Sequence, residues 1–136
     1  MVRLIMGVKG SGKTKQLIEL INNAAKDEPG NVVCIAPSRD MMFDIHYRIR
    51  LIDAKEYKLN IYDSLRGFIS GLYAGNYDIS HVFIDNLCKI IGIEIGSDVE
   101  AILNWLDVFG EKNGIKFTVS VSGDPADATE GMQKYL

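Results

Sequence analysis

No other segment limits the possible folds of this chain as strongly as residues 7–14, which read GVKGSGKT and match the spacing G-x-x-x-x-G-K-[S/T]. The segment lies between a short apolar run (VRLIM, 2–6) and a stretch whose apolar residues recur at helical spacing. A buried strand, a glycine-rich turn and the free N–H groups at a helix start together form a concave site for anions. The motif therefore predicts a strand, a loop and a helix that bind a polyphosphate.

Each fixed residue of the motif has its own expected task. Gly7, Gly10 and Gly12 allow backbone conformations closed to other residues and let the main chain approach phosphate oxygens. Lys13 is expected to reach the β- and γ-phosphates and to act in catalysis, and the Thr14 hydroxyl is an expected ligand of Mg²⁺. A turn without a ligand is the alternative interpretation. The predicted nucleotide-binding residues are Gly7, Val8, Lys9, Gly10, Ser11, Gly12, Lys13 and Thr14, together with Ser122 from the last predicted strand.

Hydrophobic periodicity predicts strands that alternate with helices. The strands are expected at 2–6, 32–36, 59–63, 81–85 and 116–122, where apolar and β-branched residues are bounded by turn-forming ones. Helical spacing of apolar residues follows the loop and recurs at 38–52, with Ser38 as N-cap, and at 64–73. A capping box from Ser97 to Glu100 predicts the start of a further helix.

This alternation predicts the architecture. Each crossover helix must bury its apolar stripe on the sheet, so the order favours a mostly parallel sheet of five strands covered on both faces. We therefore expect an α/β fold with three layers, α/β/α. No linker, repeat or low-complexity tract interrupts the chain, and residues 1–136 are expected to form a single nucleotide-binding domain.

An acidic residue on another strand completes the predicted site. Asp85 ends the run HVFID (81–85), at a position where a carboxylate holds Mg²⁺ directly or through water in sites of this kind. Thr14 and Asp85 are thus the predicted metal ligands, and Lys13 and Asp85 the predicted catalytic residues. Asn86, which follows, is neutral and cannot accept a proton, so we expect slow hydrolysis. Asp85 as a simple strand cap is the alternative.

Further polar residues at predicted strand ends are candidates for the same site. Ser122 is expected to hydrogen-bond the γ-phosphate or the attacking water, although an ordinary turn explains its position equally well. Glu94 is a candidate for a displaced base. Arg39 and Arg66 follow predicted strands and are candidates for phosphate contacts, with solvated helix starts as the alternative.

Composition excludes several classes of protein. Apolar residues make up 47% of the 136 residues and charged residues 24%, with 13 glycines, which rules out disordered and collagen-like chains. The net charge is −3 at pH 7, and basic residues outnumber acidic ones only in the N-terminal half. This balance argues against nucleic acid as a partner and favours a small, highly charged ligand. Without a membrane-length apolar run or a leader pattern, we expect a cytoplasmic protein with no membrane partner.

The cysteines and histidines do not suggest a metal site. Cys34 and Cys88 lie in apolar runs without the paired spacing of zinc ligands, and we expect both to be buried reduced thiols. His46 and His81 lack metal-like partners at useful spacing. We expect both histidines to be structural.

The motifs together resemble known families. The chain resembles the P-loop NTPases, and LIMGVKGSGKTKQLIELI (4–21) is similar to the opening of type II thymidine kinases. VVCIAPSRD (32–40) resembles their second strand, VFID (82–85) their acidic strand associated with Mg²⁺, and FTVSVSGD (117–124) their late strand. Helicase- and recombinase-like ATPases, the RecA-like group, have the same order of parts with an added strand between the loop strand and the acidic strand. The resemblance implies the P-loop NTPase fold with ATP and Mg²⁺ as ligands.

The chain departs from the thymidine kinases at several points. Those enzymes have a glutamate where Asn86 stands, a cysteine-ligated zinc element and a C-terminal lasso around the nucleoside. Two cysteines are too few for that zinc site and residues 125–136 too few for that lasso, so we do not expect thymidine kinase activity. GTP is disfavoured because the acidic strand lacks D-x-x-G and no N-K-x-D or T-K-x-D motif is present. ATP is therefore the favoured nucleoside triphosphate.

Several functions fit these residues. The first is an Mg²⁺-dependent ATP-binding protein with slow NTPase activity. The second is a non-catalytic nucleotide sensor or assembly subunit, which Asn86 and the missing base-binding elements favour. A third is a subunit of a ring or filament ATPase that an arginine from a neighbour completes, which would make the chain a homo-oligomer or the partner of another protein. A degenerate phosphotransferase of the nucleoside-kinase kind is a further alternative, and the phosphate acceptor stays open.

Overall fold

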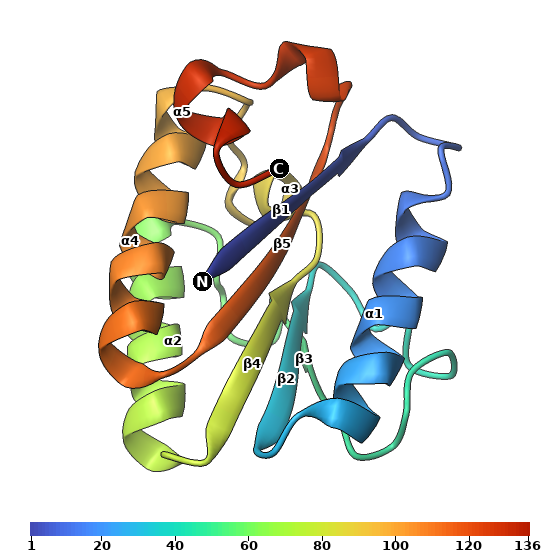
Figure 1. The fold of residues 1–136 in the computed structure, drawn as a ribbon, viewed down its shortest axis with the longest axis vertical. Coiled ribbons are helices and arrows are strands. Elements are labelled where there is room, and N and C mark those ends of the chain that lie inside the picture. The colour runs from blue at the N-terminus through green and yellow to red at the C-terminus, as the bar shows by residue number, and fades with distance from the viewer.

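A computed structural model describes residues 1–136 and contains one five-stranded sheet with helices on both faces (Figure 1). The strands are β1 (Val2–Gly7), β2 (Asn31–Ala36), β3 (Arg50–Asp53), β4 (Ile79–Ile84) and β5 (Lys116–Ser122). The helices are α1 (Lys13–Asp27), α2 (Tyr62–Gly75), α3 (Leu87–Ile91), α4 (Ser97–Asn113) and α5 (Glu130–Gln133), with a 3-10 turn, η1, at Pro125–Asp127. The expected three-layer α/β fold is confirmed.

The order of the strands places the predicted site at one edge of the sheet. It runs β1-β5-β4-β2-β3, and every neighbouring pair is parallel. β5 thus separates the loop strand β1 from the acidic strand β4, with Gly7 in register with Ser122 and Ile84 with Val119. Ligands of open parallel sheets bind beyond the carboxyl ends of the strands. The ends of β1, β5 and β4 meet there.

The sheet is buried on both faces by different helices. α1 packs on one face, where Leu17 and Ile21 contact apolar side chains of β1, β2 and β4 (Figure 1). α2 and α4 cover the opposite face, which holds the larger core around Phe117 (Figure 1). Full burial of one such apolar side chain stabilises the fold by about 1.5–3 kcal/mol. The helix stripes therefore fix the sheet between two cores and hold its carboxyl edge rigid.

The helix predicted at 38–52 is wrong. Residues 37–49 form a series of turns, and Arg50–Asp53 is the edge strand β3, parallel to β2. Asn22 of α1 supplies the hydrogen bonds that a helix would have provided, since its side chain accepts from His46 N at 2.8 Å and donates to Asp44 O at 3.0 Å. Of the apolar positions behind the helix prediction, Ile49 and Ile52 are buried, whereas Met42 is exposed and its neighbour Met41 is buried instead.

The strand predicted at 59–63 is also wrong. Leu59 is buried in a loop and α2 begins at Tyr62. The remaining strand of the sheet is β3, in a segment that was predicted to be helical. Leu59 and Tyr62 pack into the core beside the sheet, whereas Ile61 is exposed, and the edge of β2 is already paired with β3.

The capping box predicted at Ser97 is absent. α4 begins at Ser97 with Gly96 as its N-cap and no side-chain cap. The Glu100 carboxylate instead accepts hydrogen bonds from Thr129 Oγ1 at 2.6 Å and from Gly131 N at 2.9 Å. These tertiary partners outcompete the local cap, and they tie the C-terminal segment to α4.

The smaller expectations have mixed outcomes. Cys34 is fully buried, whereas Cys88 is only half-buried, and neither is in a disulfide. His81 lies in the sheet and His46 accepts a hydrogen bond from Arg48 N at 3.1 Å, so both make structural contacts. None of the helices combines the length and the apolar run that crossing a bilayer requires.

Candidate functional site

The GVKGSGKT segment forms an open loop over the start of α1. Gly10 and Gly12 both have φ of 86°, in the left-handed region that side chains rarely adopt. Gly7 is crowded in a different way: a Cβ there would meet the exposed Ser11 hydroxyl, which can rotate away, and would lie 3.3 Å from Lys13 Cβ. Gly12 is the N-cap of α1, and no side chain caps the helix or places an acid in its first turn. The free N–H groups and the positive dipole end therefore point into the loop without a protein partner.

Lys13, the first residue of α1, reaches across to the end of β5. Its ammonium donates a hydrogen bond to Ser122 Oγ at 2.6 Å. The two residues meet because Gly7 and Ser122 are paired in register and Gly123 N donates to Gly7 O at 3.1 Å. This pairing links the loop strand to β5 at the point where the loop begins.

Asp85 is held in place by β5. Ser120 Oγ donates to Asp85 Oδ1 at 3.0 Å and accepts from Asn86 N at 2.8 Å, so one buried hydroxyl orients both residues. Asp85 N donates to Ile35 O at 2.8 Å, which continues the pairing of β4 with β2. Asn86 has φ of 53° and ψ of 62°, a left-handed turn that starts α3. The carboxylate is thereby fixed on the side of the sheet edge where the loop lies.

These elements enclose a cavity of about 670 Å³. We call it the phosphate-loop cavity. Eight of the predicted site residues line this cavity: six from the loop and the start of α1, Ser122 from the end of β5, and Asp85. Two further lining residues, Asn86 and Lys89, were not predicted to bind a ligand. Gly7 and Ser11 do not line it, because Gly7 lies below the loop at the end of β1 and Ser11 faces solvent. The lining consists of Val8, Lys9, Gly10, Gly12, Lys13, Thr14, Asp85, Asn86, Lys89 and Ser122.

Comparison with solved structures identifies the type of fold. A KaiC-like protein from the archaeon Pyrococcus horikoshii matches over 98% of this chain and 68% of its own, with 16% identity and a TM-score of 0.69. The flagellar accessory protein FlaH from Methanocaldococcus jannaschii matches over 98% of this chain and 65% of its own, with 12% identity and a TM-score of 0.55. A protein named as an ATPase matches over 99% of this chain and 61% of its own, with 13% identity and a TM-score of 0.56.

This chain shares the RecA-like α/β fold of these three structures. The strand β5, inserted between the loop strand and the acidic strand, is the feature that the sequence resemblance had associated with this group. The chain spans about two thirds of the length of each of the three structures. None of them supports the finer resemblance to type II thymidine kinases. No protein-family model and no curated protein matches the sequence.

The charged groups of the phosphate-loop cavity are partly desolvated. Burial lowers the pKa of the Lys13 ammonium, and the negative charge of Asp85 opposes that shift. Burial raises the pKa of Asp85, against the hydrogen bond from Ser120 and the positive charges of Lys13 and Lys89. Both charged forms therefore gain from an opposite charge brought into the cavity.

Three further candidates from the sequence lie outside the cavity. Glu94 lines a neighbouring pocket that also includes Ser122, and does not face the loop. Arg66 pairs with Asp63 at 3.1 Å on the surface of α2. Arg39 donates weakly to Met42 Sδ at 3.7 Å in the turns after β2. No arginine lines the phosphate-loop cavity.

Sequence reasoning missed two residues of the site. Ser120 orients Asp85 from β5, and Lys89 of α3 extends into the cavity. Ser120 was visible as a polar residue in an otherwise apolar strand, and such a residue needs a buried partner. Lys89 follows Asp85 by one helical turn, a signal that depended on recognising the five-residue helix α3.

Proposed function

We propose that this chain binds Mg·ATP in the phosphate-loop cavity and hydrolyses it slowly. The observation that carries the proposal is the convergence of an uncapped helix start, left-handed glycines, Lys13 and Asp85 on one cavity of about 670 Å³. A triphosphate satisfies each of these groups, because the N–H groups and the ammonium need anions and the carboxylate needs a cation. The fold neighbours support a nucleotide as the class of ligand.

The residues of the chain would divide the work between them. The amides of the loop would cradle the α- and β-phosphates, and Lys13 would leave Ser122 to reach the β- and γ-phosphates. Ser122 would then be free to donate to the γ-phosphate or to the attacking water. The Lys13–Ser122 hydrogen bond keeps the ammonium at the cavity before the nucleotide arrives, which lowers the entropy lost on binding.

The donor set fits Mg²⁺. Thr14 and Asp85 offer a hydroxyl and a carboxylate in the same cavity, and oxygen ligands of this kind suit a hard cation. No group of three or more acidic, histidine or cysteine side chains gathers anywhere in the structure, so phosphate oxygens and water would supply the remaining ligands. When bound, the ion would offset the negative charge that develops on the transferred phosphoryl group.

The cavity offers no protein base for fast hydrolysis. Asp85 is the only carboxylate in the lining, and the Ser120 hydroxyl occupies one of its oxygens. Asn86 stands next to it with an amide that cannot accept a proton. We therefore propose that phosphate release is slow. Asn86 and Ser122 would position the attacking water, but no side chain of the cavity would act as the base that accepts its proton.

Calorimetric titration with Mg·ATP tests nucleotide binding. Lys13→Ala is expected to abolish the binding heat, because it removes the ammonium that is held at the end of β5 and is proposed to reach the β- and γ-phosphates. Lys15→Ala is the matched control, since Lys15 is an exposed lysine of the same helix outside the cavity, and this variant should bind as the wild type does. If the wild type releases no more heat than Lys13→Ala, the proposal is wrong. Parallel titrations with GTP test the preference for ATP.

A second function is favoured by Asn86 and by the absence of arginine from the cavity. The chain would act as a nucleotide-dependent assembly subunit whose catalytic arginine comes from a neighbouring copy or another protein. If the rate of phosphate release per molecule of protein rises with protein concentration, the chain is an assembly subunit of this kind. Binding with no release at any concentration supports a sensor, and concentration-independent release supports the slow monomeric NTPase.

A further inference from the structure

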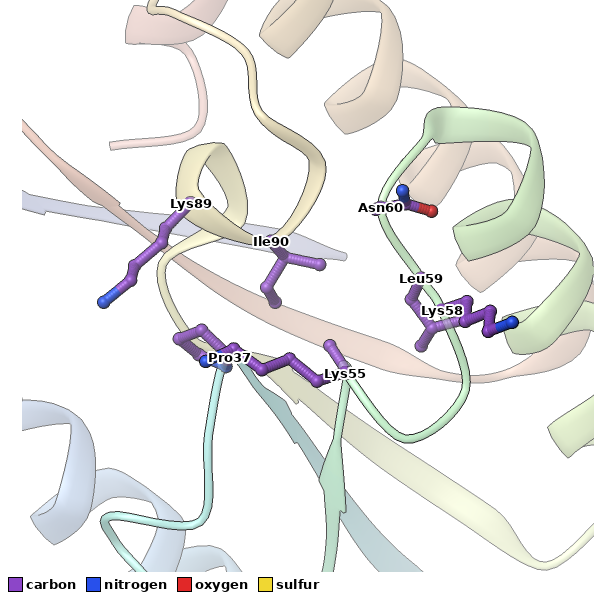
Figure 2. Close-up of a pocket in the computed structure, with 8 residues that line it drawn as sticks. Pro37, Lys55, Lys58, Leu59, Asn60, Lys89 and Ile90 are labelled. Carbon is purple, nitrogen blue, oxygen red and sulfur yellow. The ribbon is translucent and has the colours of Figure 1, made fainter.

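A second cavity lies next to the phosphate-loop cavity at the carboxyl edge of the sheet. It measures about 350 Å³ and opens between the ends of β2 and β3, the loop before α2, and α3 (Figure 2). Lys89 lines both cavities, so the two share a wall. A molecule in the second cavity would therefore lie beside the position proposed for the phosphates.

The inner surface of the second cavity is apolar. Ala54, Leu59 and Ile90 are buried in the core, with exposures of 4%, 3% and 7%. Pro37, directly after β2, adds its ring to the same surface (Figure 2). Such a surface gains free energy when the apolar body of a ligand covers it.

The rim of the second cavity is basic. Lys55, Lys58 and Lys89 line it, and no carboxylate does. Figure 2 shows the Lys55 side chain running past Pro37, so that its ammonium lies toward the side where the Lys89 ammonium projects, while Lys58 points the other way. None of the three ammonium groups has a hydrogen-bond or ion-pair partner, in contrast to Lys116, which pairs with Glu28 at 2.9 Å.

The turn that carries two of these lysines is held rigid by its own hydrogen bonds. Lys55 N donates to Asp53 Oδ1 at 2.9 Å and Leu59 N donates to Ala54 O at 3.0 Å. Lys58 has φ of 53°, and the only other non-glycine residue with positive φ is Asn86 of the phosphate-loop cavity. A rigid turn loses little conformational entropy when a ligand binds.

We propose that this cavity binds a small organic anion, with its phosphate or carboxylate group between Lys55 and Lys89 and its apolar body on Leu59 and Ile90. The four apolar side chains would select against bare inorganic anions, and the lysines against neutral molecules. The placement of this anion beside a triphosphate rests on the proposed function. Binding of the anion itself does not, because it uses neither the loop glycines nor Lys13.

Phenyl phosphate is the probe for this site, since it joins one dianionic group to one apolar ring. Titrated into the isotope-labelled full chain, it is expected to shift the backbone amide signals of Ala54, Leu59 and Ile90 in two-dimensional NMR spectra. Lys55→Ala should weaken this binding about tenfold, the effect of losing one charge-assisted hydrogen bond. Lys112→Ala, an exposed lysine of α4, should leave it unchanged. Benzyl alcohol, which carries no charge, should not shift these signals.

Two outcomes overturn the proposal: phenyl phosphate that shifts only the amides of the phosphate loop, or equal affinity for the wild type and Lys55→Ala. Lys13→Ala separates this site from the nucleotide site. It should lose Mg·ATP binding and keep the phenyl phosphate shifts at Ala54, Leu59 and Ile90. If those shifts disappear with Lys13, the second cavity is not an independent site. If they persist while the wild type fails to bind Mg·ATP, the anion site stands and the proposed nucleotide function falls.

Discussion

Acidification from pH 7 to pH 4 is expected to destabilise the protein through His81. This residue of β4 stacks on Phe83 with ring centroids 4.1 Å apart, and its Nε2 lies 2.8 Å from Thr118 Oγ1. Its Nδ1 is buried without a hydrogen-bond partner and lies 3.6 Å from Glu28 Oε2. Burial lowers the pKa of His81 from 6.5 to about 4, with Glu28 opposing the shift and Lys116 adding to it.

The direction and size of the effect follow from these two values. Between about pH 6.5 and pH 4, His81 is protonated in the unfolded chain but neutral in the folded chain. The stability contributed by neutral His81 is complete above pH 6.5 and is lost as the pH falls toward 4. At about 1.4 kcal/mol per pH unit, the loss amounts to about 3 kcal/mol. The pKa of Glu28 is lowered because its hydrogen bond to Lys116 and its other partners outweigh burial, so its contribution is lost only at lower pH, as its carboxylate becomes protonated.

Urea unfolding between pH 7 and pH 4 measures this loss. The free energy of unfolding of the wild type should fall by about 3 kcal/mol more than that of a variant without His81, most of it below pH 6.5. His81→Gln keeps a polar side chain that does not titrate, and its stability should change far less over the same range. His46→Gln removes the other histidine and should follow the wild type. Parallel curves for wild type and His81→Gln would refute the reasoning.

Two substitutions test the phosphate-loop cavity itself. Gly12→Ala should cost about 1 kcal/mol of stability and abolish Mg·ATP binding, because φ of 86° strains any side chain. The control Gly67→Ala, on the open face of α2, should stabilise the protein and leave Mg·ATP binding normal. Equal effects of the two variants in urea unfolding and calorimetry would contradict this. Ser120→Ala should lower the free energy of unfolding by about 1–3 kcal/mol and weaken the binding of Mg·ATP more than that of metal-free ATP, because Asp85 loses the hydroxyl that orients it. Ser70→Ala, which removes a hydroxyl bonded within α2, is the control. If the binding of ATP to Ser120→Ala depends on Mg²⁺ as it does in the wild type, Ser120 does not have this role.

Local signals in the sequence predicted the elements around the phosphate loop correctly. β1, α1 and β5 lie where the apolar patterns placed them, with β5 at 116–122 as expected. These segments are long or strongly patterned, and the burial of their apolar residues agrees with their local preferences. The loop spacing and the carboxylate at the end of β4 followed from the same level of information.

The tertiary structure decided the segments whose local pattern allowed two outcomes. Residues 38–52 have helical apolar spacing, yet Asn22 and the free edge of β2 offered better partners, and turns with an edge strand formed instead. In the same way, the Glu100 carboxylate accepts hydrogen bonds from Thr129 and Gly131 and does not cap the start of its own helix. Hydrogen-bond partners distant in sequence are invisible to a local pattern.

The sequence by itself determined the glycine-rich loop before α1, because its glycines act through local backbone geometry. The tertiary structure decided how the other residues meet this loop. Lys13 meets Ser122, and Asp85 meets Ser120, because β5 inserts between the strands that carry the loop and the acid. The position of Lys89 and the basic rim of the second cavity depend on where α3 and the turn after β3 lie. Packing across the edge of the sheet sets those positions, and no local sequence pattern predicts them.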